Sequence, residues 1–113
     1  MKTVLFIALT MFTSQFAYAG GNAAAGAQKA QPCAACHGAD FNTPISADIP
    51  LLAGQHADYL ARALTDYKSG ARKNPIMDGQ AAALSAQDIQ NLAAYFASLP
   101  GKLKIIPLHR LVQ

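Results

Sequence analysis

The sequence predicts an all-α domain. Its apolar residues recur at helical spacing in segments that glycine and proline separate, and no segment shows the alternation of a half-buried strand. A chain of 113 residues has room for a single domain. We therefore expect one small helical module.

The first twenty residues have the features of a secretory signal peptide. Lys2 precedes an apolar run over residues 4–12, and Ala17-Tyr18-Ala19 is an A-x-A cleavage site. A retained anchor is the alternative, but the run is shorter than the roughly 20 apolar residues that span a bilayer. We expect a signal peptide over residues 1–19. Its removal leaves 94 of the 113 residues, a periplasmic chain that starts at Gly20 and has no membrane span.

The first helix is expected over residues 22–31, because this stretch is rich in alanine and Pro32 ends it. Gly26 lies inside that helix, where glycine is unfavourable unless another element approaches closely. A long loop is expected over residues 38–50. In so small a domain, a loop of this length usually wraps something or carries function.

The second helix is expected within residues 54–70, with Gly70 as its C-cap. One face carries its apolar residues, namely Tyr59, Leu60, Ala63, Leu64 and Tyr67.

The last helix is expected to begin after Ser85. Ser85 and Asp88 form a capping-box variant, and Leu84 and Ile89 have the spacing of a hydrophobic staple. Its buried stripe is predicted to comprise Ile89, Leu92, Ala93, Phe96 and Leu99. Residues 20–99 then form the domain, and residues 100–113 form a tail of unknown role.

The charge pattern gives no support for nucleic-acid binding. Without residues 1–19, eight basic side chains face six aspartates, and the chain has no glutamate. Nucleic-acid-binding domains usually show a strongly basic patch. We therefore expect no nucleic-acid partner.

The stretch "AQPCAACHGAD" contains the pattern C-x-x-C-H at Cys33, Cys36 and His37. A reactive dithiol is expected beside a βαβ unit, which this chain lacks. A structural disulfide suits an exported protein but leaves His37 unexplained. A zinc site would need His56 or His109 as a fourth ligand. Covalent attachment of c-type haem uses all three residues, and C-x-x-C-H is typical of it.

Haem would also supply the core that this chain lacks. A chain of 94 residues without tryptophan and with many alanines has little to bury, and small domains often need a cofactor. The sulfurs of Cys33 and Cys36 would take the two vinyl groups, and His37 would be the proximal iron ligand. The long loop and the apolar faces of the second and the last helix, the former including Tyr59, would form the walls of the crevice.

The sixth iron ligand is expected to be Met77. Met1 and Met11 leave with the signal peptide, so Met77 is the sole methionine of the mature chain. Its setting, "RKNPIMDG", is predicted to be a loop from which the side chain reaches the metal. His56 and His109 are the competitors, and a core methionine is the structural alternative.

Together these motifs resemble class I c-type cytochromes, especially the small bacterial monohaem modules that also form the halves of dihaem cytochromes. The resemblance covers residues 20–99, through Gly26 and the segments "CAACHG", "PLLAGQ", "YLARAL", "NPIM" and "LSAQDIQNLAAYFASL". It implies the cytochrome c fold, wrapped around one covalent haem. It further implies that Gly26 crosses the last helix near Tyr95 and Phe96, and that the Pro44 carbonyl bonds the second ring nitrogen of His37. The loop 41–49 lacks the glycine that often follows "HGAD" in the family.

The expected function is that of a periplasmic one-electron carrier between donor and acceptor oxidoreductases, with His/Met axial ligation. The protein should be a monomer or weak dimer and not an enzyme by itself. The alternatives are a haem subunit bound to a larger oxidoreductase and a haem domain with a vacant sixth site. Docking is predicted at the haem edge that bears Cys33 and Cys36. Either Lys68, Arg72 and Lys73 steer an acidic partner there, or the contacts are apolar.

Overall fold

The computed structural model describes residues 20–103, and within that range the chain is helical and has no strand. The predicted signal peptide, most of the tail and His109 lie outside the described residues. The elements are α1 (Ala23–Lys29), a short 3₁₀ helix η1 (Gln31–Cys33), α2 (Ala34–His37), α3 (Ala57–Ser69), α4 (Pro75–Ala82) and α5 (Ala86–Ser98). The all-α prediction is confirmed.

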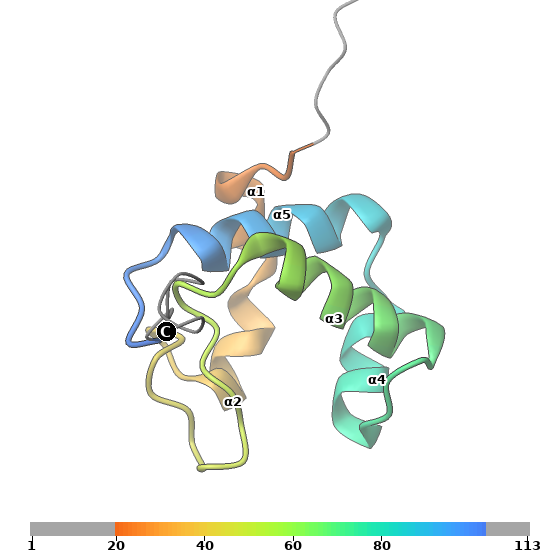
Figure 1. The fold of residues 1–113 in the computed structure, drawn as a ribbon, viewed down its shortest axis with the longest axis horizontal. Coiled ribbons are helices and arrows are strands. Elements are labelled where there is room, and N and C mark those ends of the chain that lie inside the picture. Colours follow the sequence, from red (N-terminus) through yellow and green to blue (C-terminus); the bar gives the residue numbers. More distant parts are fainter. Residues whose placement is uncertain (1–19, 104–113) are drawn as a thin grey trace, which may run out of the picture.

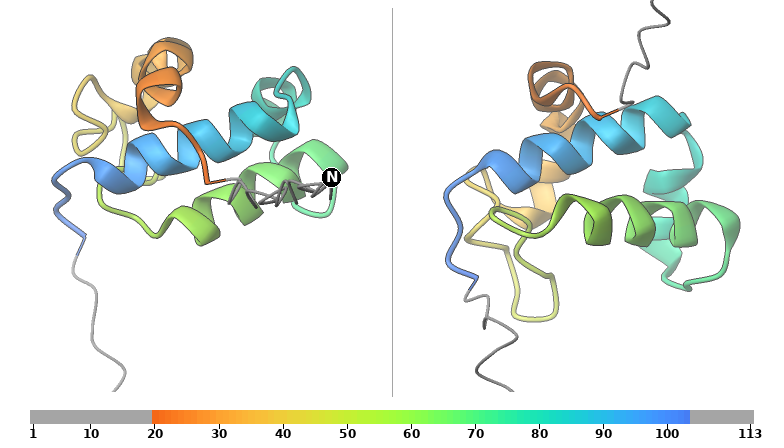
Figure 2. Two further views of the ribbon diagram at one scale, coloured as in Figure 1. Left: turned by 90° about the horizontal axis from the view of Figure 1, so that it is seen from above. Right: turned by 45° about the horizontal axis from the view of Figure 1, so that its top comes forward.

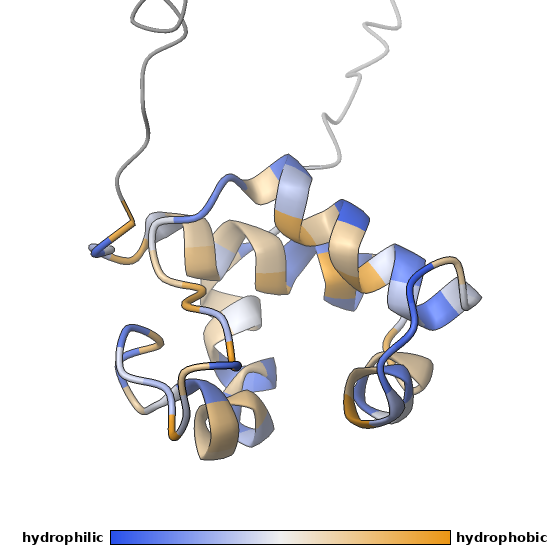
Figure 3. Cartoon of the chain, turned by 60° about the horizontal axis from the view of Figure 1, so that its bottom comes forward, coloured by the Kyte–Doolittle hydropathy of each residue, from blue (hydrophilic) through white to orange (hydrophobic). Residues whose placement is uncertain are grey.

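Helix α5 is the centre of the fold. Both α1 and α3 pack against it, α1 crossing it and α3 running alongside, as Figures 1 and 2 show. Helix α4 packs against α3. The two long helices, α3 and α5, are amphipathic, and the ribbon carries both hydrophilic and hydrophobic residues (Figure 3).

The close crossing predicted at Gly26 is present. A Cβ atom at this position would lie 2.0 Å from the carbonyl oxygen of Asn91 and 2.7 Å from the Cβ of Tyr95. The expected crossing near Tyr95 is confirmed, and Asn91 is the nearest residue of α5. Only glycine allows α1 to lie this close to α5.

The predicted stripe of α5 forms much of the core. Ile89, Leu92, Ala93 and Phe96 are buried, whereas Leu99 is half-buried and follows the last helical residue. The other buried hydrophobic residues of the described part come from several elements, namely Ala30, Phe41, Ala53, Leu60, Ala61 and Ala81.

The caps of the two long helices follow the sequence. Ser85 accepts the N–H of Asp88 at 3.0 Å, and Asp88 accepts the N–H of Ser85 at 2.9 Å, so the capping box of α5 is complete. Gly70 ends α3 with a φ of 80°, in the left-handed region. Helix α1 is shorter than predicted, because Asn22 is its N-cap and Ala30 its C-cap.

The loop prediction for Met77 is wrong, since Met77 lies in the first turn of α4. Asn74 caps this helix by accepting the N–H groups of Ile76 and Met77, both at 3.0 Å. Pro75 occupies the first helical position, where its fixed φ favours a helix and its missing N–H costs nothing. Asn-Pro therefore starts a helix here instead of marking a loop.

The segment between α2 and α3 is irregular, as predicted, and Phe41 shapes its path. Phe41 has a φ of 55° and is the only non-glycine residue with positive φ in the described chain. Its carbonyl accepts the N–H groups of Leu52 at 2.9 Å and of Ala53 at 3.1 Å. Its buried ring lies 4.8 Å from that of Phe96 in an edge arrangement. The loop is thereby folded back onto α5.

The first residues of the tail attach to this loop through Asn42. Its amide Nδ2 donates to the carbonyl of Pro100 at 2.8 Å, and its Oδ1 accepts the N–H of Lys102 at 3.0 Å. Leu103 then lines the large cavity of the molecule. The described start of the tail is therefore part of the domain surface.

Candidate functional site

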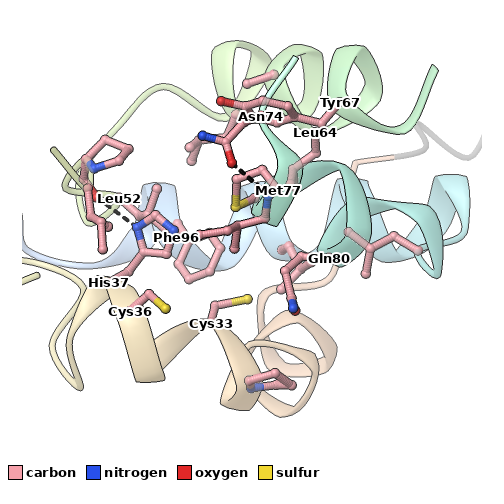
Figure 4. A pocket seen from close by; sticks show the side chains of 18 of the residues that line it. Cys33, Cys36, His37, Leu52, Leu64, Tyr67, Asn74, Met77, Gln80 and Phe96 are labelled. Carbon is pink, nitrogen blue, oxygen red and sulfur yellow. Dashed lines mark hydrogen bonds between the residues drawn. The ribbon is translucent and has the colours of Figure 1, made fainter. Parts of the chain in front are cut away.

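The C-x-x-C-H stretch forms a tight helical turn between α1 and the long loop. The 3₁₀ helix η1 begins at Gln31 and contains Pro32 in its first turn, and α2 follows it directly. Residues three and four apart on a helix share a face, so Cys33, Cys36 and His37 are brought to one side of this turn (Figure 4). Gly38 ends the turn with a φ of 87°. A Cβ atom there would lie 2.2 Å from the carbonyl oxygen of Thr43, so the turn can end in this way only at glycine.

His37 is the one buried polar or charged side chain among residues 20–103, with 7% of its surface exposed. Its Nδ1 lies 2.8 Å from the carbonyl oxygen of Pro50. A carbonyl can only accept, so Nδ1 carries the proton and Nε2 keeps a free lone pair. The imidazole therefore has the tautomer and orientation of a metal ligand.

The prediction that the Pro44 carbonyl bonds the second ring nitrogen of His37 is wrong. Pro50 supplies that carbonyl, and Pro44 is not among the residues that line the cavity. The reason is the path of the loop. The N–H of Ile45 bonds the carbonyl of Cys36 at 3.0 Å, which holds the residue after Pro44 at the end of α2. The carbonyl of Phe41 accepts the N–H of Leu52. The chain just before Leu52 thereby lies beside His37, and the carbonyl of Pro50 contacts the imidazole.

The two thiols are free and partly accessible, and no disulfide joins them. Both line the cavity (Figure 4). Burial raises the pKa of the Cys33 thiol, and the neighbouring Cys36 adds to that rise. Within residues 20–103, no three His, Cys, Asp or Glu side chains converge on a metal-sized site. Within the described residues, the structure therefore has neither a disulfide between these cysteines nor a group of ligands suited to zinc.

Met77 enters the same cavity from a different element. In Figure 4 its sulfur projects from α4 into the space that His37 faces from α2. Tyr67, from the predicted apolar face of α3, also lines this space, as does Tyr59, although 53% of its surface is exposed. Sequence reasoning missed Asn74, whose side chain accepts the N–H of Met77 at 3.0 Å. The Asn-Pro pair was the pattern that could have revealed it.

The cavity has a volume of about 1320 Å³. This exceeds the range of about 300–1,000 Å³ that holds most drug-sized ligands. Its lining is mainly apolar and includes Leu52, Leu64, Leu92 and Phe96. A flat apolar macrocycle would fill such a space, and the molecule offers it two thiols, one imidazole and one thioether.

The other candidate ligands are less well placed. His56 precedes α3 and is exposed, and it is not among the cavity-lining residues. His109 lies outside the described residues.

The predicted basic rim is only partly present. Arg72 and Lys73 line the cavity, and the Arg72 guanidinium lies 4.8 Å from the centre of the Tyr67 ring. Lys68 does not line it. Its ammonium bonds the backbone carbonyls of Ala82 and Leu84, because the C-terminal end of α4 lies beside it.

A family model described as Cytochrome c matches residues 23–100. The chain belongs to the cytochrome c family. This cytochrome therefore carries one covalently bound haem c, for which Cys33 and Cys36 have the required spacing. The donor set and the apolar cavity fit that group.

Similar proteins support the same conclusion. A cytochrome c4 from Pseudomonas aeruginosa is 45% identical over 97 residues, which cover 86% of this chain and 48% of that protein. A thiosulfate dehydrogenase electron acceptor from Stutzerimonas stutzeri is 46% identical over 71 residues, 63% of this chain and 33% of that protein. A crystal structure of reduced cytochrome c4 from Pseudomonas stutzeri has a TM-score of 0.69 and 40% identity, covering 74% of this chain and 48% of that one.

This chain thus spans about half the length of the cytochrome c4 proteins that it matches. The predicted likeness to the halves of dihaem cytochromes is confirmed, and so is the cytochrome c fold. No helix among the described residues is both long and apolar enough to cross a membrane.

Proposed function

We propose that this cytochrome is a periplasmic one-electron carrier with His37 and Met77 as the axial ligands of its haem iron. The observation that carries this proposal is the convergence of the two side chains. His37 from α2 and Met77 from α4 enter one cavity from different walls, beside the two cysteines (Figure 4). Haem c supplies the one-electron redox chemistry when bound.

The residues of the chain hold that group in a defined state. The Pro50 carbonyl keeps the proton of His37 on Nδ1, at 2.8 Å, and leaves Nε2 for the iron. The apolar lining excludes water, and a thioether ligand favours the reduced iron, so both features raise the potential. Tyr59 is proposed to contact the haem from the α3 wall.

The periplasmic location rests on the A-x-A site at residues 17–19 and on haem c as the cofactor. An oxidoreductase as electron donor is supported by the similar protein named as the electron acceptor of thiosulfate dehydrogenase. We infer that this cytochrome docks to such partners as a carrier and is not an enzyme by itself.

A redox titration of the haem-loaded protein tests the proposal. The expected result is a reversible one-electron transition, with no carbon monoxide binding to the reduced form at neutral pH. Rapid carbon monoxide binding by the wild-type protein would instead support the haem domain with a vacant sixth site. Copurification with a larger oxidoreductase through several columns would favour the bound-subunit alternative over a free carrier.

A further inference from the structure

Helix α4, which carries Met77, has few attachments to the rest of the molecule. Among the described helices it packs against α3 alone, and it lies at one end of the fold in Figure 1. Its N-terminal cap is internal, because Asn74 accepts the N–H of Met77 and Asp78 accepts the N–H of Asn74 at 3.2 Å. That cap fixes the first turn but does not tie it to another helix.

One side chain from α3 holds the other end of α4. Lys68 Nζ donates to the carbonyl of Ala82 at 3.3 Å and to the carbonyl of Leu84. Within residues 20–103, no other side chain from outside residues 74–84 makes a hydrogen bond to this segment. Lys68 is therefore the polar link between α4 and the body of the fold.

The electrostatics of a helix end favour this contact. The last carbonyl groups of a helix lack intrahelical partners and carry the negative end of its dipole. An ammonium group in the neighbouring helix satisfies them and gains a charge-assisted hydrogen bond. A cation at position 68 therefore makes this contact stronger than a neutral donor would.

The contact also affects the orientation of the Met77 side chain relative to the cavity. Met77 and Ala81 are four residues apart and share a face of α4, and Ala81 is fully buried. Lys68 bonds the carbonyl of the very next residue, Ala82. Any shift of this end away from α3 would expose Ala81 and turn Met77 relative to the cavity.

We propose that Lys68 is a positioning residue for Met77, which keeps α4 docked on α3 and the Met77 sulfur aimed into the cavity. This inference rests on the proposed ligation of the haem iron by Met77. Lys68 does not line the cavity, so its role is exerted through the backbone carbonyls of Ala82 and Leu84.

The test compares variants of the haem-loaded protein in the rate at which imidazole binds to the ferric form, since an added ligand must wait for Met77 to leave the iron. Lys68→Met keeps the aliphatic stem and removes the donor group. We expect it to accelerate imidazole binding about three- to tenfold, the effect of losing one charge-assisted hydrogen bond pair at an exposed site. Lys68→Arg, which can still donate to two carbonyls, should restore the wild-type rate.

Asn42→Ala is the matched control. It removes three side-chain hydrogen bonds, to Asp40, Pro100 and Lys102, none of which involves a residue of α4. It should lower the midpoint of unfolding by guanidinium chloride without changing the imidazole rate. Lys68→Gln, which keeps one donor group, should give an intermediate rate and serves in place of Lys68→Met if that variant does not mature.

Two results would overturn the inference. One is a wild-type imidazole rate in Lys68→Met, and the other is an equal acceleration by Asn42→Ala, which would mean that only general stability matters. A different result would show that the proposed function itself is wrong. In that case, Met77→Ala would bind imidazole at the wild-type rate and keep the wild-type spectrum, whatever the Lys68 variants do.

Discussion

The imidazole of His37 has one nitrogen bonded to the protein and one facing the cavity. The Pro50 carbonyl, 2.8 Å from Nδ1, determines which is which. At the same scale, Cys33 and Cys36 are separated by one helical turn and present their thiols to the cavity that His37 enters. Three residues within the five positions 33–37 thus define an anchor with both attachment and ligation chemistry.

Replacing Cys33 tests that anchor. Cys33→Ala should greatly reduce the yield of mature holoprotein, because one thioether does not orient the haem as two do. In the wild-type protein, acidified organic solvent should leave all haem on the polypeptide, as shown by the absorbance of the two phases. Haem in the organic phase would refute covalent attachment.

The backbone conformation of Phe41 allows a second prediction. Phe41→Ala should lower the free energy of unfolding by about 3–5 kcal/mol, the usual cost of removing a buried aromatic ring. Phe41→Gly loses the same ring but relieves the φ of 55°. It should therefore be about 1 kcal/mol more stable than Phe41→Ala, the reverse of the usual order.

Chemical denaturation of both holoproteins in parallel measures this difference. A glycine variant less stable than the alanine variant would show that position 41 leaves the left-handed region when the ring is removed.

Residue chemistry was predictable where it depends on local spacing, and not where it depends on the path of a loop. The pattern at Cys33, Cys36 and His37 predicts the anchor from five consecutive residues. The choice between Pro44 and Pro50 depends on the turn at Gly38 and on the left-handed Phe41. Phe41 occupies that conformation because its ring packs on Phe96, a contact 55 residues away that sequence spacing does not contain.

At the scale of elements, the capping residues decide which segments become helices. Ser85 and Asp88 predicted α5 correctly, because their reciprocal hydrogen bonds involve residues three apart. The same logic applies to Asn74 and Pro75 at the start of α4. The segment "RKNPIMDG" is short and polar, however, and its helical turn is stabilised by packing against α3. Periodicity is weak evidence in an eight-residue helix.

The capping box of α5 predicts a pH dependence of stability. The hydrogen bond from the Ser85 N–H, and then that from its hydroxyl, lower the pKa of Asp88 from its ordinary value. A carboxyl group with a lowered folded-state pKa stabilises the fold fully above the ordinary aspartate pKa of about 3.9. That contribution is lost as the pH falls through the lower folded-state pKa.

Asp88→Asn should therefore be less stable than the wild type at pH 7, and the difference should shrink as the pH falls below about 4. Guanidinium chloride denaturation at a series of pH values measures it. A difference that is constant from pH 7 to pH 2.5 would exclude the carboxylate as its source.

At the scale of the whole molecule, the surface around the cavity combines few charges with exposed apolar residues. Ile76 and Tyr59 line the cavity and are 68% and 53% exposed. Arg72 and Lys73 are the predicted rim cations that remain there, since Lys68 is bonded to α4. A small interface of this kind suits weak and fast docking.

Arg72→Gln and Lys73→Gln together should slow reduction by an acidic partner at low ionic strength. The slowing should fade as salt rises, because charges are screened over about 10 Å at 0.1 M salt. Arg62→Gln is the control, since Arg62 faces Asp66 at 3.2 Å and does not line the cavity. Stopped-flow rates that do not depend on salt in any variant would assign docking to the apolar residues.

The most direct test of the account is the spectrum and midpoint potential of Met77→Ala beside those of the wild-type holoprotein. Wild-type ferric protein should show the absorption band near the red end of the visible spectrum that accompanies Met–Fe(III) bonding. The variant should lose that band, bind added imidazole at once and have a markedly lower potential. An unchanged six-coordinate spectrum and an unchanged potential would contradict ligation by Met77 and transfer that role to His56 or His109.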